Sequence, residues 1–247
     1  MAIDKPGLLK PLFDRLAALD VLSEEERGAL VEAADNDVRT FAARQEIVAQ
    51  GSRPTTSKLV LSGLSARQTQ LRDGARLISG LHVSGDFVDL HSLLIGEMDH
   101  GIVAMSECTV ISFPHARLRD ITVNYPHLTR LLWLITLIDA AMHRQWLVVK
   151  GGHDSLGEAA HLLCEMYLRH QMAGLADGYS FSFPLTQQDF GDALGKSLVQ
   201  TNRVIQTLRK LGVITWQGQR VTILDWDQLT EMAEFDTTYL NFSREPR

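Results

Sequence analysis

Residues Pro184–Arg203 read PLTQQDFGDALGKSLVQTNR, and this stretch decides the fold of the C-terminal part of the chain. Thr186, followed by Asp189 three residues later, makes a helix start that resembles a capping box, with Asp in place of Glu. Gly195 then supplies a tight turn, and Ser197 can cap a second helix. Two short helices joined by a three- to four-residue glycine turn predict a helix-turn-helix.

The second helix of this pair has one inward and one outward face. Its inward positions are Thr201, Val204, Ile205 and Leu208. Its outward positions are Leu198, Val199, Gln200, Asn202 and Arg203. These outward side chains can enter a DNA major groove when the helix lies there by its N-terminal half. Two β-type runs follow, Gly212–Trp216 and Arg220–Ile223, and predict a two-stranded hairpin that would serve as a wing.

The rest of the chain alternates between helix-type and strand-type sequence patterns. Leu8–Ala34 predicts two short amphipathic helices, and Ser155–Met172 predicts another helix. Between Val38 and Pro114, short β-type runs alternate with glycine-centred turns, which predicts an antiparallel barrel or jelly roll. Those turns are Gly51-Ser52, Gly63, Asp73-Gly74 and Ser84-Gly85-Asp86.

A long apolar helix is predicted over Pro126–Val149. One reading is a core helix buried within its own chain; the other is a helix that also packs against its twin in a second subunit. We predict the second, with Leu131, Ile135, Ile138, Met142 and Trp146 at the dimer interface. The glycines of Gly151-Gly152-His153-Asp154 would break the helix and form a hinge.

Composition bounds the compartment and the class of protein. Hydrophobic residues make up 45% of the 247 residues and charged ones 22%, as in an ordinary globular protein. Apolar runs such as Leu131–Ile138 are too short to cross a bilayer, and Met1–Pro6 has no apolar signal region. Two cysteines, Cys108 and Cys164, cannot build a disulfide framework. We therefore expect a cytoplasmic protein without a membrane partner.

The charge balance differs between the whole chain and the helix-turn-helix segment. The whole chain carries a net charge of −6, which by itself argues against a nucleic-acid partner. Within Ser180–Thr222, however, the acids are Asp189 and Asp192, and the bases are Lys196, Arg203, Arg209, Lys210 and Arg220. A phosphate backbone feels this local positive charge.

The whole order of elements resembles the CRP/FNR family of bacterial transcription regulators. The resemblance extends from about Leu12 to Asp225 and is strongest over Leu185–Gly195 and Ser197–Arg203. It implies an α+β fold with an N-terminal β-roll and flanking helices, a long dimerisation helix and a C-terminal winged helix-turn-helix. The implied parts are a sensor roll at 1–125, the dimer helix at 126–150, the DNA-binding domain at 151–232 and a tail at 233–247.

The resemblance also implies roles for single residues. Thr186, Gln187, Gln188 and Ser197 would contact phosphates, and Gln200 and Asn202 would add polar contacts to DNA. Arg203 matches the family's base-reading arginine. Val199 stands where relatives carry glutamate, and Leu198 where the CRP branch carries arginine. Because valine can pack against a thymine methyl but cannot accept a hydrogen bond from cytosine, we predict a palindromic operator that differs at that base pair.

The sensor roll departs further from the family pattern. Where cyclic-AMP-binding relatives carry Gly-Glu and Arg-Ser pairs, an ungapped count places Asp89-Leu90 and His100-Gly101, our candidate effector pocket. We therefore expect no cyclic AMP binding in the usual mode. The absence of cysteine before Cys108 argues against an iron–sulfur cluster. No metal site or cofactor is predicted, although the nine histidines leave haem open.

We predict a homodimer that binds double-stranded DNA, with RNA polymerase as a further candidate partner. One alternative is a ligand-binding module of cyclic-nucleotide type without specific DNA binding; it would explain the roll but not Thr186–Arg203. An enzyme is the other alternative. The chain has no Ser/His/Asp order in an elbow context, no G-x-x-x-x-G-K and no H-E-x-x-H, so we expect no catalytic residues.

Overall fold

The computed structural model describes residues 4–72 and 74–246, so Asp73, part of one predicted turn, lies outside the described residues. Contacts divide the chain into two compact units. Unit 1 consists of Met1–Gln68, Leu81–Ala141 and Leu240–Arg247. Unit 2 consists of Thr69–Gly80 and Met142–Tyr239.

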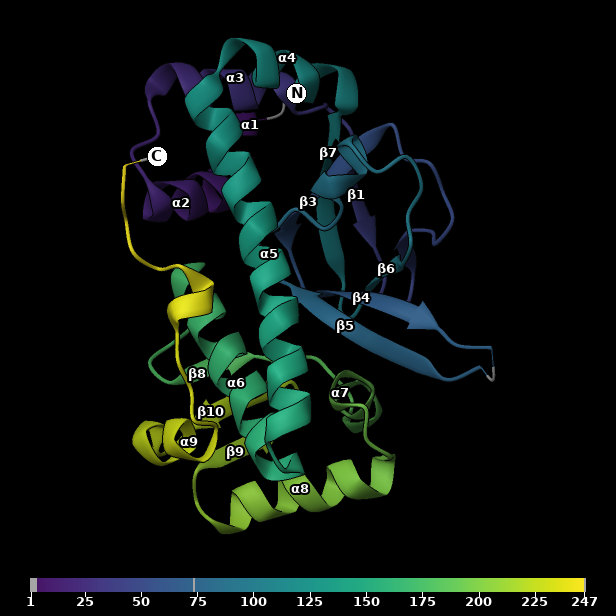
Figure 1. The fold of residues 1–247 in the computed structure, drawn as a ribbon, viewed down its shortest axis with the longest axis vertical. Helices are drawn as coiled ribbons and strands as arrows, with labels where there is room; N and C mark the ends of the chain where they lie inside the picture. The colour runs from purple at the N-terminus through teal and green to yellow at the C-terminus, as the bar shows by residue number, and fades with distance from the viewer. Residues whose placement is uncertain (1–3, 73, 247) are drawn as a thin grey trace. The chain divides into compact units, whose positions relative to one another are not determined.

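Unit 1 begins with three helices, α1 (Lys5–Leu8), α2 (Lys10–Leu19) and α3 (Glu24–Ala33) (Figure 1). Helix α3 starts at a capping box, in which the Ser23 side chain accepts from the Glu26 amide and the Glu26 side chain accepts from the Ser23 amide. The helices bury their apolar stripes in one core cluster of unit 1. The two helices predicted from Leu8–Ala34 are therefore confirmed.

The roll consists of seven short strands in two antiparallel sheets, which belong to unit 1 except for residues 69–70 and 76–80 (Figure 1). One sheet has the order β1-β7-β3 and the other β2-β6-β4-β5. Their bounds are β1 Val38–Phe41, β2 Glu46–Val48, β3 Thr56–Ser62, β4 Ser65–Gln70, β5 Arg76–His82, β6 Gly101–Ala104 and β7 Cys108–Pro114. A short 3-10 helix, η1 (Leu90–Leu93), interrupts the run between β5 and β6. The predicted jelly roll is confirmed.

Buried apolar side chains from both sheets form the core of the roll. They are Ile47, Val48, Val60, Val88, Met98, Ile102, Ala104, Cys108 and Val110. Cys108 is fully buried in this cluster, and burial raises the pKa of its thiol to about 12. The thiol is therefore a packing group.

Two helices follow the roll, α4 (His115–Asn124) and α5 (Pro126–Gly152). Helix α5 contains both glycines of the expected hinge and ends at Gly152, so the predicted helix break within Gly151-Gly152-His153-Asp154 is confirmed, while the hinge stays a prediction. The His153 amide still donates to the Val149 carbonyl at 3.0 Å, so helical hydrogen bonding continues past them. The break falls at Asp154, whose side chain caps α6 (Ser155–Met172) by accepting from the Leu156 and Gly157 amides.

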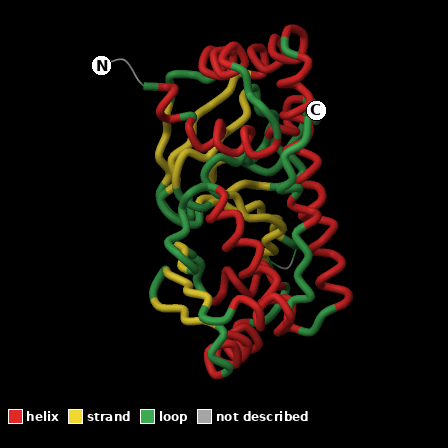
Figure 2. The backbone as a smooth tube through the Cα atoms, turned by 90° about the vertical axis from the view of Figure 1, so that its left-hand side faces the viewer, coloured by secondary structure: helices red, strands yellow, loops and turns green. Residues whose placement is uncertain are grey.

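Unit 2 contains α6, α7 (Gln187–Leu194), α8 (Leu198–Lys210) and α9 (Trp226–Met232), with η2 (Thr238–Leu240) at its end. Its sheet has the order β8-β10-β9, drawn in yellow in Figure 2. These strands are β8 Ser180–Ser182, β9 Ile214–Gln217 and β10 Arg220–Ile223. The predicted β9–β10 wing is present, and β8 adds a third strand that the sequence did not indicate. In the described ranges, no helix combines the length and apolar content that a membrane crossing needs.

Candidate DNA-binding interface

Helix α7 is set in place by its N-terminal cap. The Asp189 amide donates to Thr186 Oγ1 at 3.1 Å, and the Thr186 amide donates to Asp189 Oδ2 at 2.9 Å. Both partners of the capping box are therefore satisfied although Asp, one methylene shorter than Glu, occupies the third helical position. The helix buries Phe190 and Leu194, which fixes which side it presents to solvent.

Helices α7 and α8 approach each other closely. Gly195 ends α7 with φ +67°, a left-handed conformation that glycine adopts without steric cost. A methyl group on Gly191 would lie 2.6 Å from Thr201 Oγ1 and 2.9 Å from the Lys196 carbonyl oxygen. Only a glycine fits there without movement of α8. This contact sets the geometry of the helix-turn-helix.

Helix α8 has the two faces predicted for it. Its capping box joins Ser197 and Gln200, and its buried residues are Thr201, Val204, Ile205 and Leu208. The outward residues Leu198, Val199, Gln200, Asn202 and Arg203 are all exposed, Val199 with 71% of its surface accessible. An apolar side chain this exposed at the N-terminal half of a helix is available for contact with a partner.

The polar residues predicted to contact phosphate lie at the two helix starts. Thr186 and Ser197 are the N-caps, Gln187 is half-buried, and Gln188 is exposed. Asn202 donates to Gln187 Oε1 at 3.1 Å across the two helices, and Gln188 donates to Asp192 Oδ1 at 2.7 Å. These bonds hold the amides on the surface of the pair, within reach of a DNA backbone.

The two acidic side chains of this segment pair with an arginine that the sequence analysis missed. Arg76 of β5 donates to Asp192 Oδ2 at 2.8 Å from Nε, and its NH2 also hydrogen-bonds Asp189. All three residues belong to unit 2, and Asp189 is fully buried. Both carboxylates of the helix-turn-helix are therefore paired with one guanidinium, which offsets half of their negative charge. No sequence signal links positions 113 residues apart.

The base-reading candidate differs from its neighbours. Arg203 is exposed on α8, and no hydrogen bond or ion pair of its guanidinium occurs among residues 4–72 and 74–246. Lys196, by contrast, is paired with Glu158 at 3.0 Å, and Arg220 with Asp177 at 3.3 Å. The Arg203 guanidinium can thus donate two hydrogen bonds to a bidentate acceptor such as the O6/N7 edge of guanine.

The residues of the candidate effector pocket are mostly buried within unit 1. Asp89 is fully buried, and its Oδ1 accepts from the Lys58 amide at 2.5 Å. Burial raises the pKa of Asp89 to about 7 despite that hydrogen bond. Leu90 packs against the core of unit 1. Oδ1 of Asp89 is therefore held by the backbone of β3, and its buried Oδ2 has no hydrogen-bond partner among the described residues.

The other predicted pair, His100-Gly101, lies at the start of β6. His100 is buried, accepts from Arg67 Nε at 3.1 Å and contacts Asp99 Oδ1 through Nδ1 at 2.6 Å. Burial, and then the charge of Arg67, lower the pKa of His100 to about 4. The arginine in turn is paired with Asp139 at 2.7 Å. Arg67 and Asp139 had no signal in the sequence, because their contact depends on how β4 and α5 pack in the fold.

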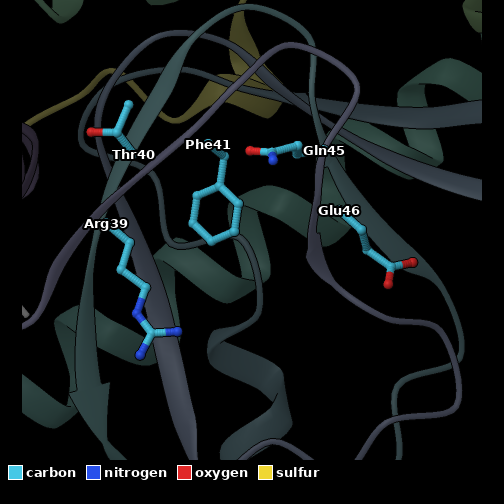
Figure 3. A pocket seen from close by; sticks show the side chains of 5 residues that line it. All are labelled: Arg39, Thr40, Phe41, Gln45 and Glu46. Atoms are coloured by element: carbon cyan, nitrogen blue, oxygen red, sulfur yellow. The ribbon is translucent and has the colours of Figure 1, made fainter.

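A pocket of about 490 Å³ lies elsewhere on unit 1, along β1 and the start of β2 (Figure 3). Its lining residues are Arg39, Thr40, Phe41, Gln45 and Glu46. All except Phe41 are solvent-exposed, and none belongs to the candidate effector pocket. It has no enclosed polar group that would fix a small molecule.

The predicted dimer residues lie on the face of α5 that is buried within the single chain. Leu131, Ile135, Ile138, Met142 and Trp146 expose between 0% and 9% of their surface within the single chain. They have almost no area left for a partner. The exposed apolar residues are instead Trp133, Leu137, Leu147 and Val148. The apolar pattern was wide enough for either face, and packing against the chain's own core occupies the first.

Comparisons with known proteins agree with this geometry. Residues 38–125 match the family model of the cyclic nucleotide-binding domain, and residues 159–232 match that of the Crp-like helix-turn-helix domain. The chain belongs to the CRP/FNR family of DNA-binding transcription regulators. A family module that binds only a ligand would leave the second match unexplained, so that alternative is set aside.

Individual relatives of this CRP/FNR protein are distant in sequence. The transcriptional activator protein FnrL of Cereibacter sphaeroides is 25% identical over 203 residues, 81% of each chain. The structure of FixK2 from Bradyrhizobium japonicum superposes with a TM-score of 0.72 at 21% identity, covering 81% of this chain and 96% of that one. A CRP/FNR family regulator from Thermus thermophilus gives 0.64 at 20% identity, covering 81% and 99%. The structural likenesses support the fold.

Proposed function

We propose that this regulator binds a palindromic DNA operator as a homodimer and places one α8 in each of two successive major grooves, about 34 Å apart. The observation that carries the proposal is the exposed N-terminal half of α8. Leu198, Val199 and Arg203 project from a helix whose opposite face is buried, beside an antiparallel wing.

The dimer would form through the exposed stripe of α5. Trp133 has 64% of its surface accessible and Leu147 has 71%, and Leu137 lies between them at helical spacing. Large apolar side chains in a row on one helix mark an interface more often than a solvated surface. A two-fold axis along this stripe would give the regulator the symmetry of a palindrome.

Sequence reading would divide between two residues. Arg203 would donate two hydrogen bonds to one guanine, a contact worth about 1–3 kcal/mol of discrimination. Val199 offers only a branched apolar surface, which suits the methyl group of thymine. Thr186, Gln187, Gln188 and Ser197 would hold the register through phosphates, helped by the two helix N-termini.

The sensing mechanism would differ from that of cyclic-AMP-dependent relatives. Asp89 is buried against β3, and His100 is engaged by Arg67, so neither offers the ribose or phosphate contacts of the usual mode. Only two cysteines are present, and both are buried, which argues against a four-thiolate cluster. We expect a regulator without a catalytic step, acting where its DNA lies in the cytoplasm, with RNA polymerase as a partner.

Selection from randomised duplex DNA tests the proposal. The purified full chain should enrich a sequence with two-fold symmetry, and Arg203→Ala should lose preference at one symmetric position. Arg244→Ala, which removes an exposed positive charge from the tail, is the matched control and should select the wild-type sequence. Binding that shows no sequence preference and equal affinity in both variants would contradict the proposal.

A further inference from the structure

Three side chains with metal-ligating atoms meet next to β6 in unit 1. They are His91 of η1 and Asp99 and His100, which precede the strand. One ligand atom from each lies within 4.8 Å of the other two. The rings of His91 and His100 have centroids 5.1 Å apart, and His100 Nδ1 is 2.6 Å from Asp99 Oδ1. The sequence showed no metal spacing here, because η1 and the strand start are brought together by the roll.

The donor set has a definite chemistry. Two imidazoles and one carboxylate suit first-row divalent ions, whereas Mg²⁺ and Ca²⁺ prefer oxygen ligands alone. Asp99 has 80% of its side chain exposed, so water can reach the cluster and complete a coordination shell. In a tetrahedral or octahedral shell the ligand atoms lie about 3 Å apart, so small side-chain rotations from the present spacing are sufficient.

We propose that His91, Asp99 and His100 form a binding site for a divalent first-row transition-metal ion. The ion would take one nitrogen from each imidazole and one oxygen from Asp99, with water in the remaining positions. None of these three residues belongs to the candidate DNA-binding interface, so the metal site does not depend on the proposed function.

Metal binding would compete with a hydrogen bond that the structure shows. Arg67 donates to His100 Nε2 at 3.1 Å, so that nitrogen accepts and Nδ1 carries the ring proton. A metal on Nε2 takes the place of the guanidinium. A metal on Nδ1 moves the ring proton to Nε2, which then can no longer accept from Arg67. Either way the Arg67–His100 bond is lost.

Through this competition, metal binding would affect a second contact of Arg67 within unit 1. Arg67 also pairs with Asp139 of α5 at 2.7 Å, and its side chain is 6% exposed. When His100 binds the metal, the buried guanidinium of Arg67 loses this hydrogen bond and keeps its other contacts, which include the Asp139 carboxylate. Metal binding therefore changes the surroundings of the ion pair between Arg67 of β4 and Asp139 of α5.

Titration of the chelator-treated full chain with Co²⁺ under anaerobic conditions tests the site. We expect one Co²⁺ per chain, a visible absorption band from nitrogen and oxygen ligands, and displacement by Zn²⁺. His91→Ala and His100→Ala should each weaken binding about tenfold or more. His153→Ala, in unit 2 and outside the cluster, should bind as the wild type does.

A second pair of variants tests the competition with Arg67. Arg67→Met with Asp139→Asn removes the competing donor and keeps the charge balanced, so Co²⁺ affinity should rise about threefold or more. Arg53→Met with Glu97→Gln is the matched control, since it removes an exposed pair at 3.2 Å in the same unit and should leave the affinity unchanged.

Three results would overturn the proposal. One is the absence of a Co²⁺ band in the wild-type chain. Another is unchanged affinity and stoichiometry in a folded His91→Ala/His100→Ala variant, which would place the ion elsewhere. The third is a spectrum with thiolate charge-transfer bands, which would assign the metal to a cysteine. DNA selection by the same preparations separates failure of this site from failure of the proposed function.

Discussion

Replacing Gly191 by alanine tests how α7 and α8 are held together. The added methyl group would lie 2.6 Å from Thr201 Oγ1 and 2.9 Å from the Lys196 carbonyl oxygen, both inside contact distance. Thr201 is fully buried, and its hydroxyl donates to the Ser197 carbonyl at 2.9 Å, so it cannot rotate away without losing that bond. The backbone of α8 must therefore move.

The expected magnitude follows from two opposing terms. Overpacking a tight contact costs about 1–3 kcal/mol. Replacing glycine by alanine inside a helix stabilises the folded state by about 1 kcal/mol. We expect Gly191→Ala to be destabilised by a net ~0–2 kcal/mol, and to bind its operator more weakly because α8 is displaced. Gly151→Ala is the control: its methyl group meets nothing within 4 Å, so that variant should gain up to ~1 kcal/mol.

Thermal unfolding and operator titration measure both effects. For a chain of this size, 1 kcal/mol corresponds to a midpoint shift of about 2–4 °C, so the two variants should move in opposite directions. A Gly191→Ala protein as stable as Gly151→Ala, with full DNA affinity, would refute the close approach of the two helices. Reduced operator affinity in Gly151→Ala would instead support Gly151 as a hinge.

Three further predictions follow from single residues. Val199→Glu should change the preferred base at one symmetric position per half-site, measured by repeating the DNA selection; an identical selected sequence would exclude contact at that position. Leu137→Glu should shift the protein from dimer to monomer in light scattering, whereas Val123→Glu, on the exposed side of α4, should not; a dimeric Leu137→Glu protein would place the interface elsewhere. Asp89→Asn should remove a pH dependence of stability. Since burial raises the pKa of Asp89 to about 7, the unfolding free energy of the wild type relative to that of the Asn variant, which can still accept from the Lys58 amide, should fall as pH rises from about 4 through 7; a difference that does not change with pH would contradict this.

The local signals in the sequence predicted much of the helix-turn-helix. Capping boxes at Thr186 and Ser197, the glycine turn at Gly195 and the buried period of α8 all depend on residues within four positions of one another. Helical hydrogen bonds and caps have this short range, so one sequence is enough to reveal them. The alternation of strands and turns likewise indicated a roll without showing which strands pair.

Only the tertiary structure shows which other part of the molecule each face of a helix or strand packs against. Helix α5 has an apolar stripe broad enough for two interfaces, and only packing shows that Ile135 turns inward while Leu137 remains exposed. The pairing of Arg76 with Asp192 and the meeting of His91 with His100 join segments that are distant or separated by a loop. A sequence determines what each segment can bury or bond, and the fold determines which of the available surfaces it meets, because burial and electrostatic contacts act through space and not along the chain.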